Sequence, residues 1–315
     1  MKLIIAFFRL IRWPNLAFIA ITQTLFYYCI YTPLLFTQPS ANNQLLFFIL
    51  MAASVLIAAA GYIINDYFDI QIDIINKPQR IVINKYIKRR WAIMWHLLLS
   101  AIGILMSLYV SFKTGEWLIS FVNIFCVAIL LFYSTTFKRK LLSGNLIIAA
   151  LTAWVILVVY LFGGADIFSL EGWKINTSNL NIPRFFKFTL LYASFAFIMT
   201  LIREVLKDLE DMEGDRKYNC TTMPIVWGVP AAKVFTAVWI SVSLASLAVI
   251  QLYAWQSGWW WAAVYVLLLT FLPLAILLQK LYKASTTAHY NQLSKIVKLV
   301  MLAGILSMLF VKYIL

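Results

Sequence analysis

Acidic residues are rare in this chain, and most of them gather in two short segments. The chain has twelve Asp and Glu residues. Nine of them are Asp66, Asp69 and Asp73 in the first segment and Glu204, Asp208, Glu210, Asp211, Glu213 and Asp215 in the second. Each segment lies at the end of a long apolar run. Carboxylates near membrane depth are costly and usually face a cavity or a partner, so the two segments predict binding sites for cations.

Helical periodicity places most of these acids on single faces. Asn65, Asp69 and Asp73 fall within about 80° of one another on an α-helix. The members of the second stripe, which fall within about 60°, are Glu204, Asp208, Asp211 and Asp215. Glu210 and Glu213 point elsewhere and are expected to be solvated. Like charges four residues apart destabilise a helix, so cations must neutralise them. Oxygen ligands of this kind suit Mg²⁺, which bridges carboxylates to substrate phosphates.

No other catalytic or metal motif competes with the acids. A zinc motif, a Walker loop, a dinucleotide glycine fingerprint and a serine elbow are all missing from the sequence. Cys29, Cys126 and Cys220 show neither disulfide nor metal spacing. His96 and His289 are isolated near predicted helix ends, where an interfacial histidine is expected rather than a ligand. The remaining alternative for either acidic segment alone is a solvated acidic helix end.

The rest of the chain predicts an all-α, polytopic membrane protein. Of its 315 residues, 63% are hydrophobic and 12% charged, and the mean hydropathy is +0.87. A soluble core of this size cannot bury so much apolar surface. Nine apolar runs are long enough to cross a bilayer, near 13–34, 45–64, 93–112, 116–134, 145–164, 186–206, 233–255, 259–280 and 295–314. We expect a single transmembrane domain over residues 1–315, whose first helix is retained because no cleavage site follows it.

Positive residues are distributed very unequally between the two sides of the nine predicted spans. The N-terminus and the alternate loops that share its side carry 21 Lys and Arg residues, and the other side carries 5. Positive residues stay cytoplasmic, so we expect the N-terminus and both acidic segments inside and the C-terminus on the opposite side. The net charge of +14 then attracts anionic lipid and surrounds a site for an anionic substrate. Nucleic-acid binding is a poor alternative, because no basic domain projects from the membrane.

The ordered motifs resemble the UbiA superfamily of intramembrane prenyltransferases. Residues 65–73 read N-D-Y-F-D-I-Q-I-D, matching that family's N-D-x-x-D-x-x-x-D signature. Residues 76–80 resemble its N-K-P-x-R-P continuation, with Ile81 where proline is usual. Residues 207–216 resemble its second aspartate motif, residues 133–139 its loop between helices four and five, and residues 12–15 its opening. Asn219 and Thr221 depart from the usual glycine and basic residue. The longer spacing from Tyr133 to Lys138 resembles the geranylgeranylglyceryl-phosphate geranylgeranyltransferase branch.

The resemblance implies nine helices around a central cavity that opens to the cytoplasm. It also implies a prenyl diphosphate as donor, a lipophilic acceptor, Mg²⁺ as cofactor and membrane lipids as surroundings. The metal contacts that it implies are Asn65, Asp66, Asp69, Asp73, Asp208, Asp211 and Asp215, with Asp69 and Asp208 expected to be catalytic. The diphosphate would bind Lys77, Arg80, Lys138 and Arg139, each of which positive-inside topology explains equally well. Glu204, Asn15 and Tyr133 are further candidates.

Several functions stay open at this point. The acceptor is a geranylgeranylglyceryl phosphate-like lipid or an aromatic quinone or haem precursor. A CDP-alcohol phosphotransferase is disfavoured, because Ile70 follows Asp69 where that family needs glycine. A divalent-cation or organic-anion transporter is disfavoured, because the acids lie at span ends rather than at the bilayer midplane.

Overall fold

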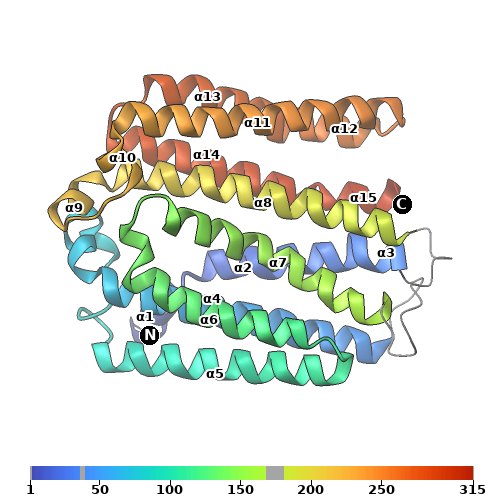
Figure 1. Cartoon of the computed structure of the whole chain (residues 1–315), viewed down its shortest axis with the longest axis horizontal. Coiled ribbons are helices and arrows are strands. Elements are labelled where there is room, and N and C mark those ends of the chain that lie inside the picture. Colours follow the sequence, from blue (N-terminus) through green and yellow to red (C-terminus); the bar gives the residue numbers. More distant parts are fainter. Residues whose placement is uncertain (1, 36–39, 168–180, 315) are drawn as a thin grey trace. The chain divides into compact units, whose positions relative to one another are not determined.

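The computed structural model describes residues 2–35, 40–167 and 181–314, and Figure 1 shows the course of the chain. Within these ranges all regular structure is helical, apart from an isolated bridge between Ile83 and Ile87. The α-helices are α1 (Lys2–Leu10), α2 (Trp13–Phe26), α3 (Thr32–Leu35), α4 (Ala41–Asn76), α5 (Arg89–Thr114), α6 (Trp117–Thr135), α7 (Ser143–Ile167), α8 (Ile182–Glu210), α9 (Met212–Lys217), α10 (Met223–Val226), α11 (Gly228–Gln256), α12 (Trp260–Val266), α13 (Leu272–Lys283), α14 (Thr287–Leu306) and α15 (Met308–Ile314). Two π-helical turns (Tyr27–Tyr31, Leu267–Phe271) and two 3-10 turns (Pro78–Arg80, Phe137–Arg139) complete them.

The predicted all-α membrane architecture is confirmed. Nine stretches in the described ranges are long and apolar enough to cross a bilayer, and each one overlaps one of the nine predicted spans. The largest difference is α4, which extends to Asn76 although the apolar run was predicted to end at residue 64. Hydropathy detects only the lipid-facing stretch. The helix continues because Ile70 and Ile72 remain buried on it, flanked in sequence by Asp69 and Asp73.

The sequence predicted the first span but not the structure of the residues that precede it. α1 is an additional short helix before the span, and it was not expected from the sequence. Arg12 joins α1 to α2 in a left-handed backbone conformation (φ 51°, ψ 52°), which is uncommon for a residue other than glycine. Pro14 follows in the first turn of α2, where its missing N–H costs nothing. At this corner the Arg12 side chain turns toward Asp66 of α4.

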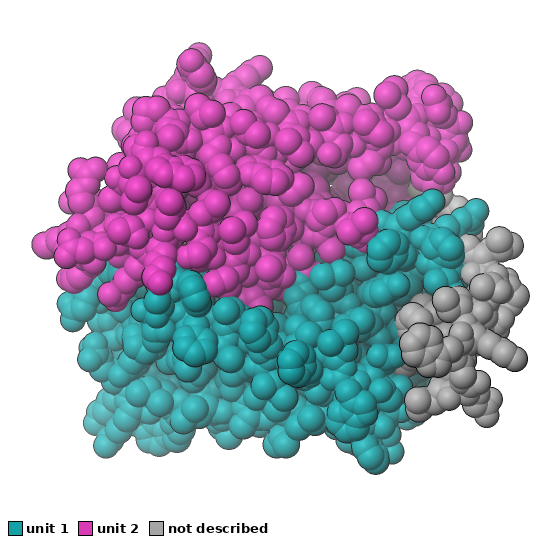
Figure 2. All heavy atoms as spheres, viewed as in Figure 1, with its two compact units in different colours: residues 1–137, 154–189 teal, residues 138–153, 190–315 magenta. Residues whose placement is uncertain are grey.

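The described helices cluster into two compact units, shown in different colours in Figure 2. The first unit comprises residues 1–137 and 154–189, and the second comprises residues 138–153 and 190–315. The long helices α7 and α8 therefore each contribute to both units. The first acidic segment belongs to the first unit and the second segment to the second unit. The assignment of residues 1–315 to one domain, and the central cavity, stay predictions.

Each unit has its own core. In the first unit α4 and α5 run side by side (Figure 1), and Gly103 permits their close approach. A Cβ atom there would lie 2.8 Å from Cγ1 of Ile57 and 3.2 Å from the carbonyl oxygen of Ala53. Small residues of this kind let helices pack tightly in membranes. In the second unit buried apolar side chains of α8, α11, α13 and α14 form one cluster, which fixes the helix that carries the second acidic segment.

Candidate metal and diphosphate site

The first acidic segment contains a buried amide–carboxylate pair. Asn65 and Asp69, one turn apart on α4, are only 9% and 3% exposed. The Asn65 Nδ2 donates a hydrogen bond to Asp69 Oδ2 over 2.6 Å. The other amide atom, Oδ1 of Asn65, is buried and has no hydrogen-bond partner within the protein. Buried polar atoms are nearly always satisfied, so this oxygen fits a metal ion or a metal-bound water.

Asp66 lies beside the stripe and pairs with a cation from the start of the chain. Arg12 Nη2 lies 2.5 Å from Asp66 Oδ1, and its guanidinium also lies over the Tyr62 ring, 5.3 Å from the centroid. Burial opposes the charge of Arg12, but the neighbouring Asp66 carboxylate outweighs it and raises the pKa of this guanidinium. Arg12 was not among the predicted site residues. Its only signal was its place in the opening motif at residues 12–15.

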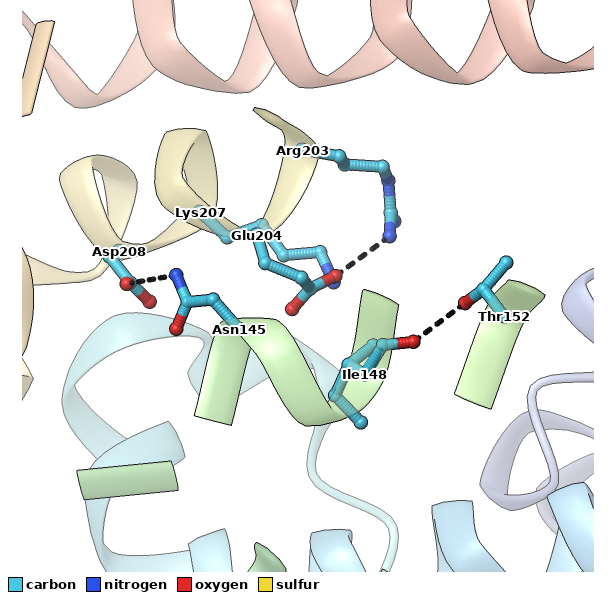
Figure 3. A network of polar contacts seen from close by, with 7 residues as sticks. All are labelled: Asn145, Ile148, Thr152, Arg203, Glu204, Lys207 and Asp208. Atoms are coloured by element: carbon cyan, nitrogen blue, oxygen red, sulfur yellow. Dashed lines mark hydrogen bonds and ion pairs between the residues drawn. The ribbon is translucent and has the colours of Figure 1, made fainter. Parts of the chain in front are cut away.

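The second acidic segment contains two carboxylates with different partners (Figure 3). Asn145, near the start of α7, donates from Nδ2 to Asp208 Oδ2 over 2.8 Å. Glu204 Oε1 accepts from Lys207 Nζ over 2.5 Å and from Arg203 Nη1 over 3.2 Å. Glu204, one of the further candidates, therefore binds cations of its own helix. Asn145 was not among the predicted site residues, and its position as a polar residue opening an apolar helix was the available signal.

The second acidic segment was predicted to lie on one unbroken helix, and this prediction is wrong because the helix breaks at Asp211. α8 ends at Glu210, α9 begins at Met212, and Asp211 between them has φ −97° and ψ 8°. Backbone hydrogen bonds from Asp211 N to Lys207 O (2.8 Å) and from Asp215 N to Asp211 O (3.2 Å) still preserve the four-residue spacing across the break. Local geometry rather than hydropathy decides such a break, which explains why periodicity alone did not predict it.

The loop that carries two of the predicted diphosphate ligands is tied to the second segment. Thr221 donates to the carbonyl oxygen of Arg139 from its backbone N (2.7 Å) and its Oγ1 (3.0 Å). Lys138 lies within electrostatic range of Glu204, and the Arg139 side chain is exposed. The second unit therefore brings together Lys138, Arg139 and the acids of α8 and α9. Thr221, which departs from the family pattern, serves here as a structural clamp.

The remaining predicted residues have various positions. Asp73 lies in the last turn of α4, and Lys77 directly follows the helix, where its backbone N donates to Asp73 O over 2.8 Å. The Arg80 side chain falls outside the described atoms. Asn15 on α2 and Tyr133 on α6 are half-buried. Of the two acids that were set aside, Glu213 is exposed as expected, whereas Glu210 accepts a hydrogen bond from Asn291 over 2.6 Å.

The donor set suits a cation that takes part of its coordination from another molecule. No group of three or more His, Cys, Asp or Glu residues in the described part of the chain is arranged to hold a metal ion by itself. The first acidic segment offers the unpartnered Oδ1 of Asn65 and the carboxylate of Asp69, and the second offers the carboxylate of Asp208. Mg²⁺ is typically held by one or two carboxylates, with water and substrate phosphates completing its shell. The residues present fit that arrangement.

The fold and the acids define a class: a polytopic helical membrane protein with aspartate-rich helix ends. The model of the UbiA prenyltransferase family matches residues 25–297. The chain therefore belongs to the UbiA prenyltransferase family.

Two curated proteins are similar to this chain in sequence, and one solved structure has a similar fold. A digeranylgeranylglyceryl phosphate synthase of Methanobrevibacter smithii is 32% identical over 261 residues, which are 82% of this chain and 83% of that protein. The enzyme of the same name from Methanosphaera stadtmanae is 33% identical over 173 residues, 55% of this chain, and the match spans only 54% of that relative. A UbiA homologue from Archaeoglobus fulgidus, solved bound to DMAPP and Mg²⁺, shares the fold with a TM-score of 0.56 at 14% identity over 96% of this chain and 98% of that one.

Proposed function

We propose that this chain transfers a prenyl group from a prenyl diphosphate to the hydroxyl of a geranylgeranylglyceryl phosphate-like lipid. The buried Asn65–Asp69 pair with its unpartnered amide oxygen is the observation that carries the proposal. The pair belongs to the C-terminal half of α4, a helix long and apolar enough to cross a membrane, and in this proposal a lipid-borne substrate meets the pair there. The names of the relatives support the acceptor, and the bound DMAPP and Mg²⁺ of the Archaeoglobus fulgidus homologue support the donor and the cofactor.

The proposed reaction is a substitution at the allylic carbon of the donor. The allylic C–O bond breaks and its electron pair leaves with the diphosphate. The acceptor oxygen bonds to the allylic carbon, so the products are an ether, diphosphate and a proton. Magnesium, when bound, would supply positive charge that neutralises the charge developing on the diphosphate.

The residues of the chain would hold and orient the diphosphate. In this proposal the oxygen ligands of the first acidic segment are Asn65, Asp69 and Asp73. Those of the second acidic segment are Asp208, Asp211 and Asp215. Asn145 fixes the orientation of Asp208. Lys77, Arg80, Lys138 and Arg139 provide cations for the phosphate oxygens, as charge-assisted hydrogen bonds to phosphate require.

Asp66 has a separate place in this proposal. Its carboxylate is paired with Arg12, so in this proposal Asp66 takes part in the metal site together with that ion pair. The proposal also places the N-terminus and the acidic ends of α4 and α8 on the cytoplasmic side, because the positive residues concentrate there.

The experiment that tests this function is an acceptor and donor panel. The purified chain in lipid nanodiscs would receive Mg²⁺, prenyl diphosphates of several lengths, and either phosphorylated glycerol lipids or aromatic quinone and haem precursors. Mass spectrometry would identify the products. We expect a prenylated glycerol lipid and release of diphosphate, both abolished by a chelator. An exclusively aromatic product would overturn the acceptor, and ion uptake without diphosphate release would replace the enzyme by a transporter.

The first prediction concerns the two aspartates expected to be catalytic. Asp69→Ala and Asp208→Ala should each lower transfer at least about 100-fold, because a lost ligand leaves the diphosphate charge uncompensated in a low-dielectric site. Initial rates at saturating Mg²⁺ would measure this. The control is Glu213→Ala, which removes an exposed acid next to the second segment and should leave the rate within about twofold. A variant that keeps wild-type transfer removes its aspartate from the mechanism.

A further inference from the structure

The short helix α1 has one apolar face in the protein core and a second apolar face that is exposed. Leu10 on the first face is fully buried. On the other side Ile4, Ile5 and Phe8 fall within about 100° of one another, and Ile4 and Phe8 are 62% and 48% exposed. Arg9 is exposed and lies between the two faces of the helix. Because α1 is too short to cross a bilayer, its exposed apolar face needs a separate explanation.

One aromatic contact and two exposed tryptophans give the depth of α1. Phe7 of α1 packs on Trp95 of α5, with ring centroids 5.0 Å apart, and Figure 1 shows α1 beside the beginning of α5. Trp91, one turn earlier on α5, and Trp13, at the start of α2, are both exposed. Tryptophans at the ends of spans typically lie at the membrane–water interface. Trp95 lies about 6 Å deeper than Trp91 along the axis of α5, so α1 packs just inside the interface.

The covalent connection to α2 also keeps α1 at the membrane surface. Ile11 and Arg12 alone separate α1 from α2, and a span begins at Trp13. The left-handed backbone of Arg12 turns the chain at this point, so α1 does not continue the axis of the span. A helix of 9 residues is about 14 Å long. Lipid headgroups and the first acyl carbons are therefore within reach of the exposed face.

The protein surface around α1 is cationic. Leu10 of α1 and Ile83 of the loop before α5 belong to the same buried apolar cluster, so the loop and α1 share one part of the first unit. Residues 1–15 and 77–95 contain nine Lys and Arg residues and no Asp or Glu. The exposed cations include Arg9, Lys85, Lys88 and Arg90. Basic clusters next to membrane spans attract anionic lipids. Positive-inside topology explains the side on which these cations lie, but it does not explain the exposed apolar face beside them.

We propose that α1 and the loop before α5 form a binding surface for anionic lipids of the leaflet on the side of the N-terminus. In this arrangement α1 lies in the plane of the leaflet, with Ile4 and Phe8 among the acyl chains and the cations at the headgroups. Interfacial helices bury their apolar face about 5–10 Å into the boundary between headgroups and acyl chains, which agrees with the depth of Trp95. The surface adjoins the first acidic segment, because α1 leads into Arg12, which pairs with Asp66.

Fluorescence quenching in nanodiscs tests the position of α1. A thiol-reactive fluorophore is attached to Ile4→Cys or Phe8→Cys, while the native cysteines are buried and the unsubstituted chain gives the background. We expect strong quenching by doxyl-labelled lipid, and quenching by aqueous iodide at least about threefold weaker than for the control, because the apolar face lies in the leaflet. The control is Ser257→Cys in an exposed loop. A monodisperse elution profile checks that each labelled chain is folded.

The same label tests the preference for anionic lipid. Doxyl-phosphatidylglycerol and doxyl-phosphatidylcholine are compared at the same low fraction in a phosphatidylcholine nanodisc. We expect the anionic lipid to quench the Ile4→Cys label at least about twofold more strongly, because the cations concentrate it there. The combined variant Lys85→Gln, Lys88→Gln and Arg90→Gln should bring this ratio close to one. The matched control, Lys280→Gln with Lys283→Gln, removes exposed cations of α13 in the second unit and should leave the ratio unchanged.

Three results would overturn the proposal. If iodide quenches the labels on α1 as strongly as the label at Ser257→Cys, the helix lies in water. If the labels on α1 are shielded from both iodide and doxyl lipid, a second copy of the chain or another protein covers this face. If the two doxyl lipids quench equally, α1 contacts lipid without binding anionic headgroups. None of these results depends on prenyl transfer, so the proposed function is tested separately.

Discussion

At the scale of single residues, the acids of the two segments differ in the partners that hold them. Asp69 is held by Asn65 of its own helix, whereas Asp66 is held by Arg12 and Asp208 by Asn145, both remote in the sequence. Periodicity predicted which acids share a face, because that depends only on the helical repeat. It did not predict Arg12 or Asn145, because contacts over 54 and 63 residues depend on how the helices pack.

The contact from Asn145 gives a prediction at this scale. Asn145→Ala should lower the transfer rate about 10-fold or more and raise the Mg²⁺ concentration for half-maximal rate, since Asp208 loses the hydrogen bond that orients it. Rates over a Mg²⁺ titration would measure both effects. The matched control is Thr152→Val on the same helix, because that hydroxyl only bonds the carbonyl oxygen of Ile148 (Figure 3). Equal Mg²⁺ titration curves for Asn145→Ala and the wild type would contradict the positioning role.

At the scale of helices, the apolar runs predicted every span but not every helix end. A bilayer requires about 20 apolar residues per span, and composition alone reveals such runs. The continuation of α4 to Asn76 and the break at Asp211 lie beyond the ends of the predicted apolar runs. Backbone and side-chain contacts of the polar ends decide the structure there, so the ends that carry the candidate site were the least predictable parts of the spans.

The crossing of α4 and α5 gives a prediction whose sign is opposite to helix propensity. In an open helix position, replacing glycine by alanine stabilises by about 1 kcal/mol. At Gly103 the new methyl group would meet Ile57 and the backbone oxygen of Ala53, so we expect Gly103→Ala to destabilise by about 1–3 kcal/mol. Thermal unfolding in detergent would measure the change. Ala101→Leu, a larger change at an exposed position of the same helix, should leave the Tm almost unchanged. A higher Tm for Gly103→Ala would disprove the close approach.

At the scale of the whole molecule, the parity of nine spans and the distribution of charge predict the orientation. Loops that follow even-numbered spans share the side of the N-terminus, and these loops carry most of the Lys and Arg residues. The same parity predicts that the ends of α4 and α8, and therefore both acidic segments, lie on that side. The orientation thus determines from which compartment a soluble diphosphate product departs.

Cysteine accessibility tests this orientation. The native cysteines Cys29, Cys126 and Cys220 are all buried, so a membrane-impermeant maleimide should label the unsubstituted chain weakly. Lys85→Cys lies in the exposed loop after the second span, and Ser257→Cys lies in the exposed loop after the seventh. Because positive residues are retained in the cytoplasm, intact cells should protect Lys85→Cys and expose Ser257→Cys to the reagent, and inside-out vesicles should reverse the pattern. Labelling of Lys85→Cys in intact cells would invert the topology and place both acidic segments outside. Diphosphate would then be released away from the cytoplasm, which makes the labelling pattern a test of the proposed site as well as of the fold.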